Sequence, residues 1–271
     1  MTPSRRPKRR SESKAIDVGL DVAQAITSTA LAAAIASSPV ATAAAGVSAI
    51  VSRVGKDFAL RQLSEMQITR VDTVLEQVRA AINRKLSEGY TVRSDDFLSG
   101  QPGHRSLAEE LSEGVLIAVE DEHEELKLPF FANLLANFVF RPDINRSMAN
   151  FLVDLAMQLS YRQLTLLKAA IIGEGYPVIW NSWPYPAATY EPNMRFLHAE
   201  IRDLSTRELI EFHHLTSDDS QSKFYGAGCA RIDLTNQFGE LLCNLMEIWN
   251  LEGRELDETL GLLRYRDPAL A

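Results

Sequence analysis

Two adjacent histidines in the C-terminal half are the first residues in this sequence that suggest chemistry. His213 and His214 precede Asp218, Asp219 and Cys229, a set that contains metal ligands and a thiol with a nearby base. Neighbouring histidines on a helix or strand point in different directions, and no C-x-x-C or H-x-x-x-H spacing accompanies them. Both a metal site and a Cys229 nucleophile are therefore disfavoured. The chain also has no P-loop, Rossmann glycine fingerprint or G-x-S-x-G elbow, so we expect no enzyme activity and no cofactor.

A second candidate is the run 120–125, in which His123 is surrounded entirely by acidic residues. Carboxylates beside a histidine can bind a hard or borderline cation. Consecutive residues on a helix diverge, however, so most of these side chains would not converge on one ion. The run therefore favours a solvated acidic helix face over a metal site.

Aromatic side chains between Gly173 and Pro192 are candidates for contact with a partner. This segment interleaves tyrosines and tryptophans with four prolines, which prevents a regular helix. Two interpretations remain open for Trp180, Trp183 and Tyr185. They either plug the core or form an exposed surface that anchors a partner.

The N-terminus is strongly basic. Six bases stand in the first 14 residues, against the single acid Glu12: Arg5, Arg6, Lys8, Arg9, Arg10 and Lys14. Without an apolar pattern, residues 1–14 are expected to be a disordered tail that is either simply solvated or in contact with anionic lipid or another polyanion.

Composition indicates a folded protein from a reducing compartment. The chain has 271 residues, of which 46% are hydrophobic and 24% charged, enough to build a core unaided. The only cysteines, Cys229 and Cys243, are expected in the core. The net charge is −8 despite the basic tail, so the rest of the chain is acidic and should repel phosphate backbones.

Residues 15–53 include a long uncharged stretch, from Val22 to Ser52, that is rich in Ala, Ser and Thr. Pro39 divides it into two short pieces, and small residues insert into bilayers weakly. Three interpretations compete: a helical hairpin packed on the body, a membrane-active segment, and a cleaved export signal. Export is disfavoured because acids precede the apolar stretch.

Helical spacing dominates the next part of the chain. An amphipathic helix is predicted from Arg53 to about Leu86, within segment 54–93, followed by a loop over 94–103 that we expect to separate it from a helical domain, 104–271. In that domain, Ser106 to Glu109 has capping-box spacing, and 128–140 should be a central buried helix. Ser160 to Gln163 repeats the capping box. The apolar positions of the two flanking helices are Phe151, Leu152, Leu155, Leu159, Leu164, Leu167 and Ile171.

The order of elements over about 160–250 is that of a winged helix. Phe196 to Leu204 predicts a helix, and a third capping box, Ser205 to Glu208, predicts a short helix through about His213. A strand is predicted at 230–234, then a helix capped by Thr235 that runs through Ile248. The predicted fold is therefore mainly α, a helical bundle with a small winged-helix-like β-hairpin in the C-terminal half.

Charge argues against duplex DNA as the partner of this module. Its predicted recognition helix, Ser205 to His214, offers only Arg207 beside two glutamates, and the wing would present Asp218 and Asp219 to the phosphates. A protein-binding or structural role is therefore favoured, with Arg207 as a weak candidate contact.

Two stretches resemble known protein families. Leu234 to Leu242, LTNQFGELL, is similar to the strand-to-helix seam after the wing of winged-helix proteins. The run Lys127 to Ile171, with LPFFANLLANF and LVDLAMQLSYRQLTLL, is similar to bacterial abortive-infection alpha-type domains. That resemblance implies a helical protein linked to phage defence, and it implies no activity or functional residue.

Together these patterns favour a non-enzymatic interaction protein that binds a protein partner in bacterial phage defence. The expected location is cytoplasmic, either free or attached to or inserted in the inner membrane through residues 1–53. The alternative is a winged-helix transcription regulator that binds DNA as a homodimer formed through the helix from Arg53 to Leu86.

Overall fold

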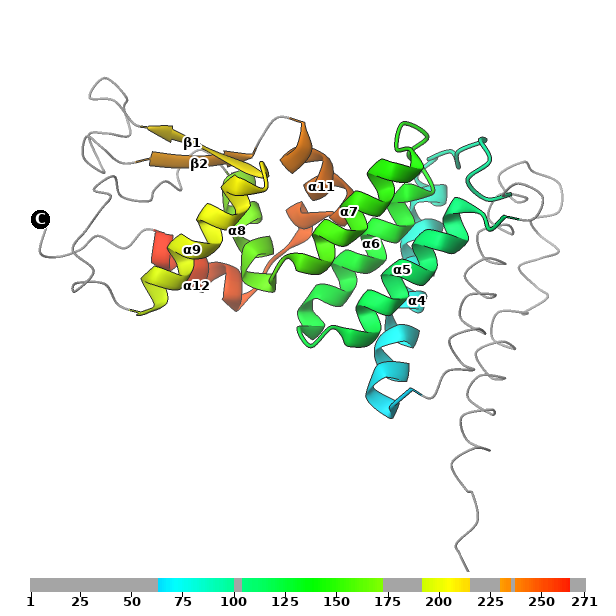
Figure 1. Ribbon diagram of the computed structural model, residues 1–271, viewed down its shortest axis with the longest axis horizontal. Helices are drawn as coiled ribbons and strands as arrows, with labels where there is room; N and C mark the ends of the chain where they lie inside the picture. Colours follow the sequence, from blue (N-terminus) through cyan, green and yellow to red (C-terminus); the bar gives the residue numbers. More distant parts are fainter. Residues whose placement is uncertain (1–62, 100–103, 173–191, 215–229, 235–236, 264–271) are drawn as a thin grey trace, which may run out of the picture. The chain divides into compact units, whose positions relative to one another are not determined.

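The structure is a computed structural model that describes residues 63–99, 104–172, 192–214, 230–234 and 237–263 (Figure 1). These residues form a mainly helical protein with a two-stranded antiparallel sheet in the C-terminal half, which confirms the predicted fold class. The chain divides into two compact units, Met1–Asp154 and Leu155–Ala271, and the division falls inside α7 (Arg146–Gln158).

The first unit is built around α4, α5 and α6, which pack against one another. Their bounds are α4 Glu65–Ser87, α5 Leu107–Asp121 and α6 Leu128–Phe138, with the 3-10 turn η1 at Glu125–Lys127. The predicted apolar stripe of α4 is confirmed, since Val71, Val78 and Ile82 are buried. The helix ends in a Schellman turn at Gly89, whose φ is 90°. The predicted start at Arg53 lies outside the described residues, and the described helix begins at Glu65, capped by Ser64.

The central helix of this unit is α6, as the sequence predicts. Pro129 occupies its first turn, and Phe131, Leu134 and Phe138 are fully buried. Arg93 closes its C-terminal end: the buried guanidinium donates to the carbonyl oxygens of Phe138 (3.4 Å) and Ile144 (3.2 Å). The first bond serves a carbonyl of the last turn of α6, and the second joins Arg93 to the chain just before α7.

The expected boundary between α4 and the rest of the fold differs from the observed division. Residues 94–99 form turns that join α4 to α5 inside one unit, because α4 packs extensively on α6. The capping box from Ser106 to Glu109 begins α5 as predicted. The acidic helix is shorter than predicted, since α5 ends at Asp121 and Glu125 starts η1.

The second unit is organised around α8 (Tyr161–Ile172), whose Leu164, Leu166 and Leu167 are fully buried. It contacts α9 (Pro192–Thr206), β2 (Ala230–Leu234), α11 (Phe238–Met246), η2 (Ile248–Asn250) and α12 (Arg254–Leu263). The Ser160 capping box is confirmed, with Gln163 N–H donating to Ser160 Oγ at 3.1 Å. A short helix with a polar N-terminal turn therefore holds most of this unit together.

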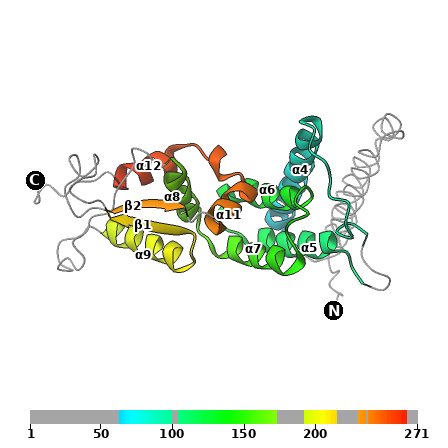
Figure 2. The ribbon, with the colours of Figure 1, turned by 90° about the horizontal axis from the view of Figure 1, so that it is seen from above.

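The segment predicted as a recognition helix is instead a strand, and the prediction from the third capping box is wrong. β1 (Ile210–His214) pairs antiparallel with β2, and Phe212 lies opposite Ile232. Figure 2 shows β1 beside α9 and β2 toward α8. Ser205 lies in the last turn of α9, where Glu208 adopts φ 59° and its N–H donates to Ser205 O (3.0 Å). This Schellman turn ends the helix where the capping box predicted a new one.

The last helices differ from the prediction in their boundaries. Thr235 lies outside the described residues, and the N-cap of α11 is Gln237. Ile248 belongs to η2, because Glu247 adopts φ 54° and ends α11 at Met246. Ile248 is nevertheless buried, as the apolar pattern predicts.

Candidate functional site

Of the residues predicted to contact a partner, only Arg207 falls within the described structure. Trp180, Trp183 and Tyr185 lie outside the described residues, as do the candidate polyanion contacts of the tail, which are Arg5, Arg6, Lys8, Arg9 and Arg10. Arg207 follows the end of α9. Its Nε donates to Asp203 Oδ2 (2.8 Å), and its Nη1 donates to Gln158 Oε1 (2.9 Å). The guanidinium is therefore held by side chains of its own unit.

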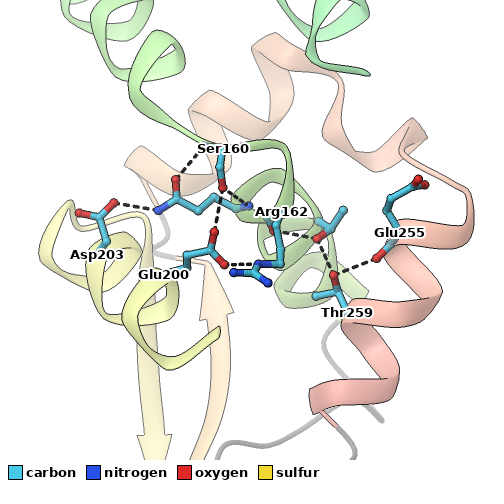
Figure 3. A network of polar contacts seen from close by, with 8 residues as sticks. Ser160, Arg162, Glu200, Asp203, Glu255 and Thr259 are labelled. Carbon is cyan, nitrogen blue, oxygen red and sulfur yellow. Dashed lines mark hydrogen bonds and ion pairs between the residues drawn. The ribbon is translucent and has the colours of Figure 1, made fainter. Parts of the chain in front are cut away.

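Asp203, which Arg207 contacts, belongs to a polar network between the N-terminal end of α8 and α9 (Figure 3). The two acids of α9, Glu200 and Asp203, point toward α8. Ser160 Oγ donates to Glu200 Oε1 at 3.0 Å, and Arg162 forms an ion pair with the same carboxylate. Gln163 Nε2 donates to Asp203 Oδ2 at 2.8 Å. The capping box therefore both begins α8 and joins α8 to α9.

The network continues into the buried interior through two threonines. Thr165 and Thr259 are buried, and their hydroxyl oxygens lie 2.9 Å apart, so α8 is also joined to α12. Thr259 Oγ1 also lies 2.9 Å from the carbonyl oxygen of Glu255, and Thr165 Oγ1 lies 2.7 Å from Arg162 O, so one hydroxyl donates to the other threonine while the second donates to the carbonyl oxygen of its own helix. Each hydroxyl has an acceptor, which removes the cost of burying it.

Electrostatics show that Asp203 is held in its charged form. Partial burial opposes ionisation, but hydrogen bonds from Arg207 and Gln163, together with the charge of Arg207, lower its pKa below the ordinary value. An aspartate of this kind is a weak proton acceptor near neutral pH. On α9, burial lowers the pKa of His198, and the charge of Arg202 lowers it further, so this imidazole is neutral at pH 7. The network is suited to joining helices.

The acidic cluster around His123 has a different arrangement from the predicted solvated face. The chain leaves the helix after Asp121, so one ligand atom each from Glu122, His123 and Glu124 lie within 4.8 Å of one another. Glu122 is buried, against expectation, and its carboxylate forms an ion pair with the equally buried Lys127. Lys127 Nζ also lies 5.3 Å from the centre of the Phe131 ring. The ammonium contacts Oε2 of Glu122, while the other oxygen, Oε1, faces His123.

The other predicted chemical groups are only partly described. Cys243 is buried and free, and burial followed by the charge of Glu240 raises its pKa to about 12, so it is an inert core thiol. Cys229, Asp218 and Asp219 lie outside the described residues. His213 and His214 are in β1, where their backbones pair with Arg231 and Ala230.

Two aromatic residues that the pattern placed in helix cores are exposed instead. Phe151 of α7 is 53% exposed and Phe196 of α9 is 62% exposed, whereas their neighbours Leu152 and Leu197 are buried. Sequence reasoning missed both residues because each stands directly before a leucine that takes the core position. The offset of each aromatic residue from the buried apolar stripe of its own helix is the signal that would have predicted its exposure.

Comparison of the chain with protein-family models, with curated proteins and with solved structures finds no match. Among the described residues, no helix is long and apolar enough to cross a bilayer.

Proposed function

We propose that this chain is a non-enzymatic interaction protein that binds a protein partner through the outward face of α7. The observation that carries the proposal is the exposure of Phe151. Met148, three residues earlier on the same face, is 38% exposed, while Ala149, Leu152 and Val153 on the other face are buried. Aromatic and methionine side chains are enriched where protein partners meet.

The first unit holds this face in place. Arg146 forms an ion pair with Glu110 of α5, and Asn150 Nδ2 donates to Glu110 Oε1 at 2.7 Å. α5 and α7 also lie close together at Gly114, where a Cβ would make an ordinary van der Waals contact of 3.9 Å with Val153 Cγ1. A helix that is joined to the rest of its unit has less backbone entropy to lose when it binds a partner.

The polar network of the second unit supports a non-enzymatic role. Arg162 and Arg207, with neighbouring amides or hydroxyls, contact the carboxylates of Glu200 and Asp203. These carboxylates are therefore better suited to joining helices than to transferring protons.

The biological setting that we propose is bacterial phage defence, on the resemblance of the run from Lys127 to Ile171 to abortive-infection alpha-type domains. Phage plating on a strain with and without the gene tests this part directly. If deletion leaves phage sensitivity unchanged, the defence role is wrong, whatever the protein binds.

The partner surface is tested by capture with tagged full-length protein from cells with and without phage. The Met148→Ser/Phe151→Ser variant should lose a specific protein that the wild type retains, and phage resistance should fall in parallel. Met66→Ser is the matched control, because Met66 is 57% exposed on α4 of the same unit. Equal capture by all three proteins, with unchanged thermal stability, would contradict the assignment of α7.

A further inference from the structure

One side of α4 carries two buried polar atoms that lack a hydrogen-bond partner. In the part of the chain that the structure describes, the buried side-chain atoms without such a partner are Arg70 Nε and Gln77 Oε1. Arg70 Nε lies 3.7 Å from a carboxylate oxygen of Glu125, which is an ion-pair contact but is too long for a hydrogen bond. Buried polar atoms of folded proteins are nearly always hydrogen-bonded, so these two atoms indicate that a further group contacts α4 here.

The two atoms lie on the same side of α4, the side next to α5. Arg70 and Gln77 are two helical turns apart, and Thr73 lies between them on the same side. Nη1 of Arg70 donates to the carbonyl oxygen of Glu120 at 3.3 Å, near the end of α5. Ile117, one turn before Glu120, is 37% exposed. We refer to Arg70, Thr73, Gln77 and Ile117 as the α4–α5 face.

The N-terminal part of the chain is attached beside this face. The described residues begin at 63, directly before the N-cap Ser64, and Gln67 Nε2 in the first turn of α4 donates to Glu120 Oε1 at 3.3 Å. Residues 53–64 join the uncharged stretch, Val22–Ser52, to α4. When extended they can span roughly 40 Å, which exceeds the length of α4, about 34 Å. The uncharged stretch can therefore reach every part of the α4–α5 face.

The chemistry of the uncharged stretch matches that of the α4–α5 face. Its serine and threonine hydroxyls can accept a hydrogen bond from Arg70 Nε and donate one to Gln77 Oε1. Its alanines allow a close approach to a helix, and it brings no charge that would have to be buried at the contact. Pro39 divides the stretch into two pieces, and either piece, as a helix, would be shorter than α4.

We propose that, in the absence of a membrane, the uncharged stretch docks on the α4–α5 face of its own chain. Residues 53–64 act as a tether that holds the stretch at a high effective concentration, so a contact that would be weak between separate molecules can form within one. The hydroxyls of the stretch then supply the partners that Arg70 Nε and Gln77 Oε1 lack. Docking and entry into a bilayer exclude each other, because the stretch cannot contact α4 and lipid with the same side chains.

Hydrogen exchange of the full-length protein, measured by mass spectrometry in buffer without lipid, tests the proposal. The amides of residues 22–52 should exchange about tenfold or more slowly than those of an unstructured chain. Thr73→Arg and Ile117→Arg each place a charge on the α4–α5 face, and each should return these amides to fast exchange. Asn83→Arg is the matched control, because Asn83 is exposed on a different side of α4. This control should leave the protection of residues 22–52 unchanged.

The amides of α6 report on the fold of the first unit in the same experiment, and they should exchange equally slowly in the wild type and in every variant. The proposal is overturned if residues 22–52 of the wild type exchange as fast as an unstructured chain. It is also overturned if these residues exchange no faster in Thr73→Arg and Ile117→Arg than in Asn83→Arg. Protection that appears only at high protein concentration would overturn it as well, because the stretch would then bind a second copy of the chain.

Discussion

Lys127 is a buried charge that is compensated by one buried partner, Glu122. It is 2% exposed, and its ammonium contacts the carboxylate of Glu122, which is 7% exposed. Removing one partner of a buried pair leaves the other charge without compensation, whereas replacing both with apolar residues does not. The two charges are five residues apart, and they pair because α5 ends at Asp121, before both of them.

We predict that Lys127→Met lowers the free energy of unfolding by about 3 kcal/mol, and that Lys127→Met/Glu122→Leu recovers most of this loss. Urea denaturation of the full chain measures both changes. Arg254→Met is the control, since Arg254 and Glu258 form an exposed pair that should contribute about 0.5 kcal/mol or less. If Lys127→Met lowers the free energy of unfolding by no more than Arg254→Met does, the pair of Lys127 and Glu122 is not shielded from water.

Asp203 leads to a prediction about acid. Its pKa is lowered in the folded protein, so its ionised form stabilises the fold above the ordinary carboxyl pKa of 3.8, and this contribution is lost as the pH falls through the lower folded value. Asp203→Asn should therefore be less stable than wild type at pH 6, and the gap should close below pH 3.8. Urea melts across this pH range measure the gap. A constant gap for Asp203→Asn would refute the prediction.

At the scale of elements, the turn between α9 and β1 decides whether the chain continues as helix or strand. Glu208 adopts a left-handed conformation there, and its N–H and that of Leu209 bond to the last turn of α9. Leu204 and Leu209 are both fully buried, which adds the apolar contact that accompanies a Schellman turn. Side chains other than glycine and asparagine are strained in this conformation.

We predict that Glu208→Gly raises the free energy of unfolding by roughly 0.5 kcal/mol, because relief of strain exceeds the entropy that glycine loses on folding. Glu208→Val should lower it by more than about 1 kcal/mol, because a β-branched residue is least tolerated at positive φ. Thermal denaturation ranks the two variants against wild type. If valine is tolerated as well as glycine, this turn does not fix the end of α9.

The helix starts could be read from the sequence, and one helix end could not. Ser106 and Ser160 begin helices as predicted, because a capping box needs only residues three apart. Ser205 has the same local spacing, yet it lies at a C-terminal end, since the turn at Glu208 and the burial of Leu209 decide the outcome. The local sequence pattern therefore does not distinguish the two helix starts from this helix end. The contacts of Glu200 and Asp203 with α8 span about 40 residues, so no local pattern could have predicted them.

At the scale of the molecule, the apolar face of Met148 and Phe151 lies on the first unit, whereas the polar network of Glu200 and Asp203 lies in the second. The variant that tests the apolar face leaves every residue of that network unchanged.

The basic tail gives the last prediction, which concerns where the whole protein is located. Each of its six bases can add about 1 kcal/mol of attraction to an anionic membrane surface, and the uncharged stretch from Val22 to Ser52 can then enter the interface. We expect full-length protein to float with vesicles that contain anionic lipid and not with neutral vesicles.

Replacing Arg5, Arg6, Lys8, Arg9, Arg10 and Lys14 with glutamine should abolish this flotation without changing the length of the chain. Salt should weaken it in the wild type, because the attraction is screened over about 10 Å at 0.1 M ionic strength. Flotation that persists in the glutamine variant would assign membrane binding to the uncharged stretch alone. A wild-type protein that stays in solution with both vesicle types would mean that the tail and this stretch do not bind membranes.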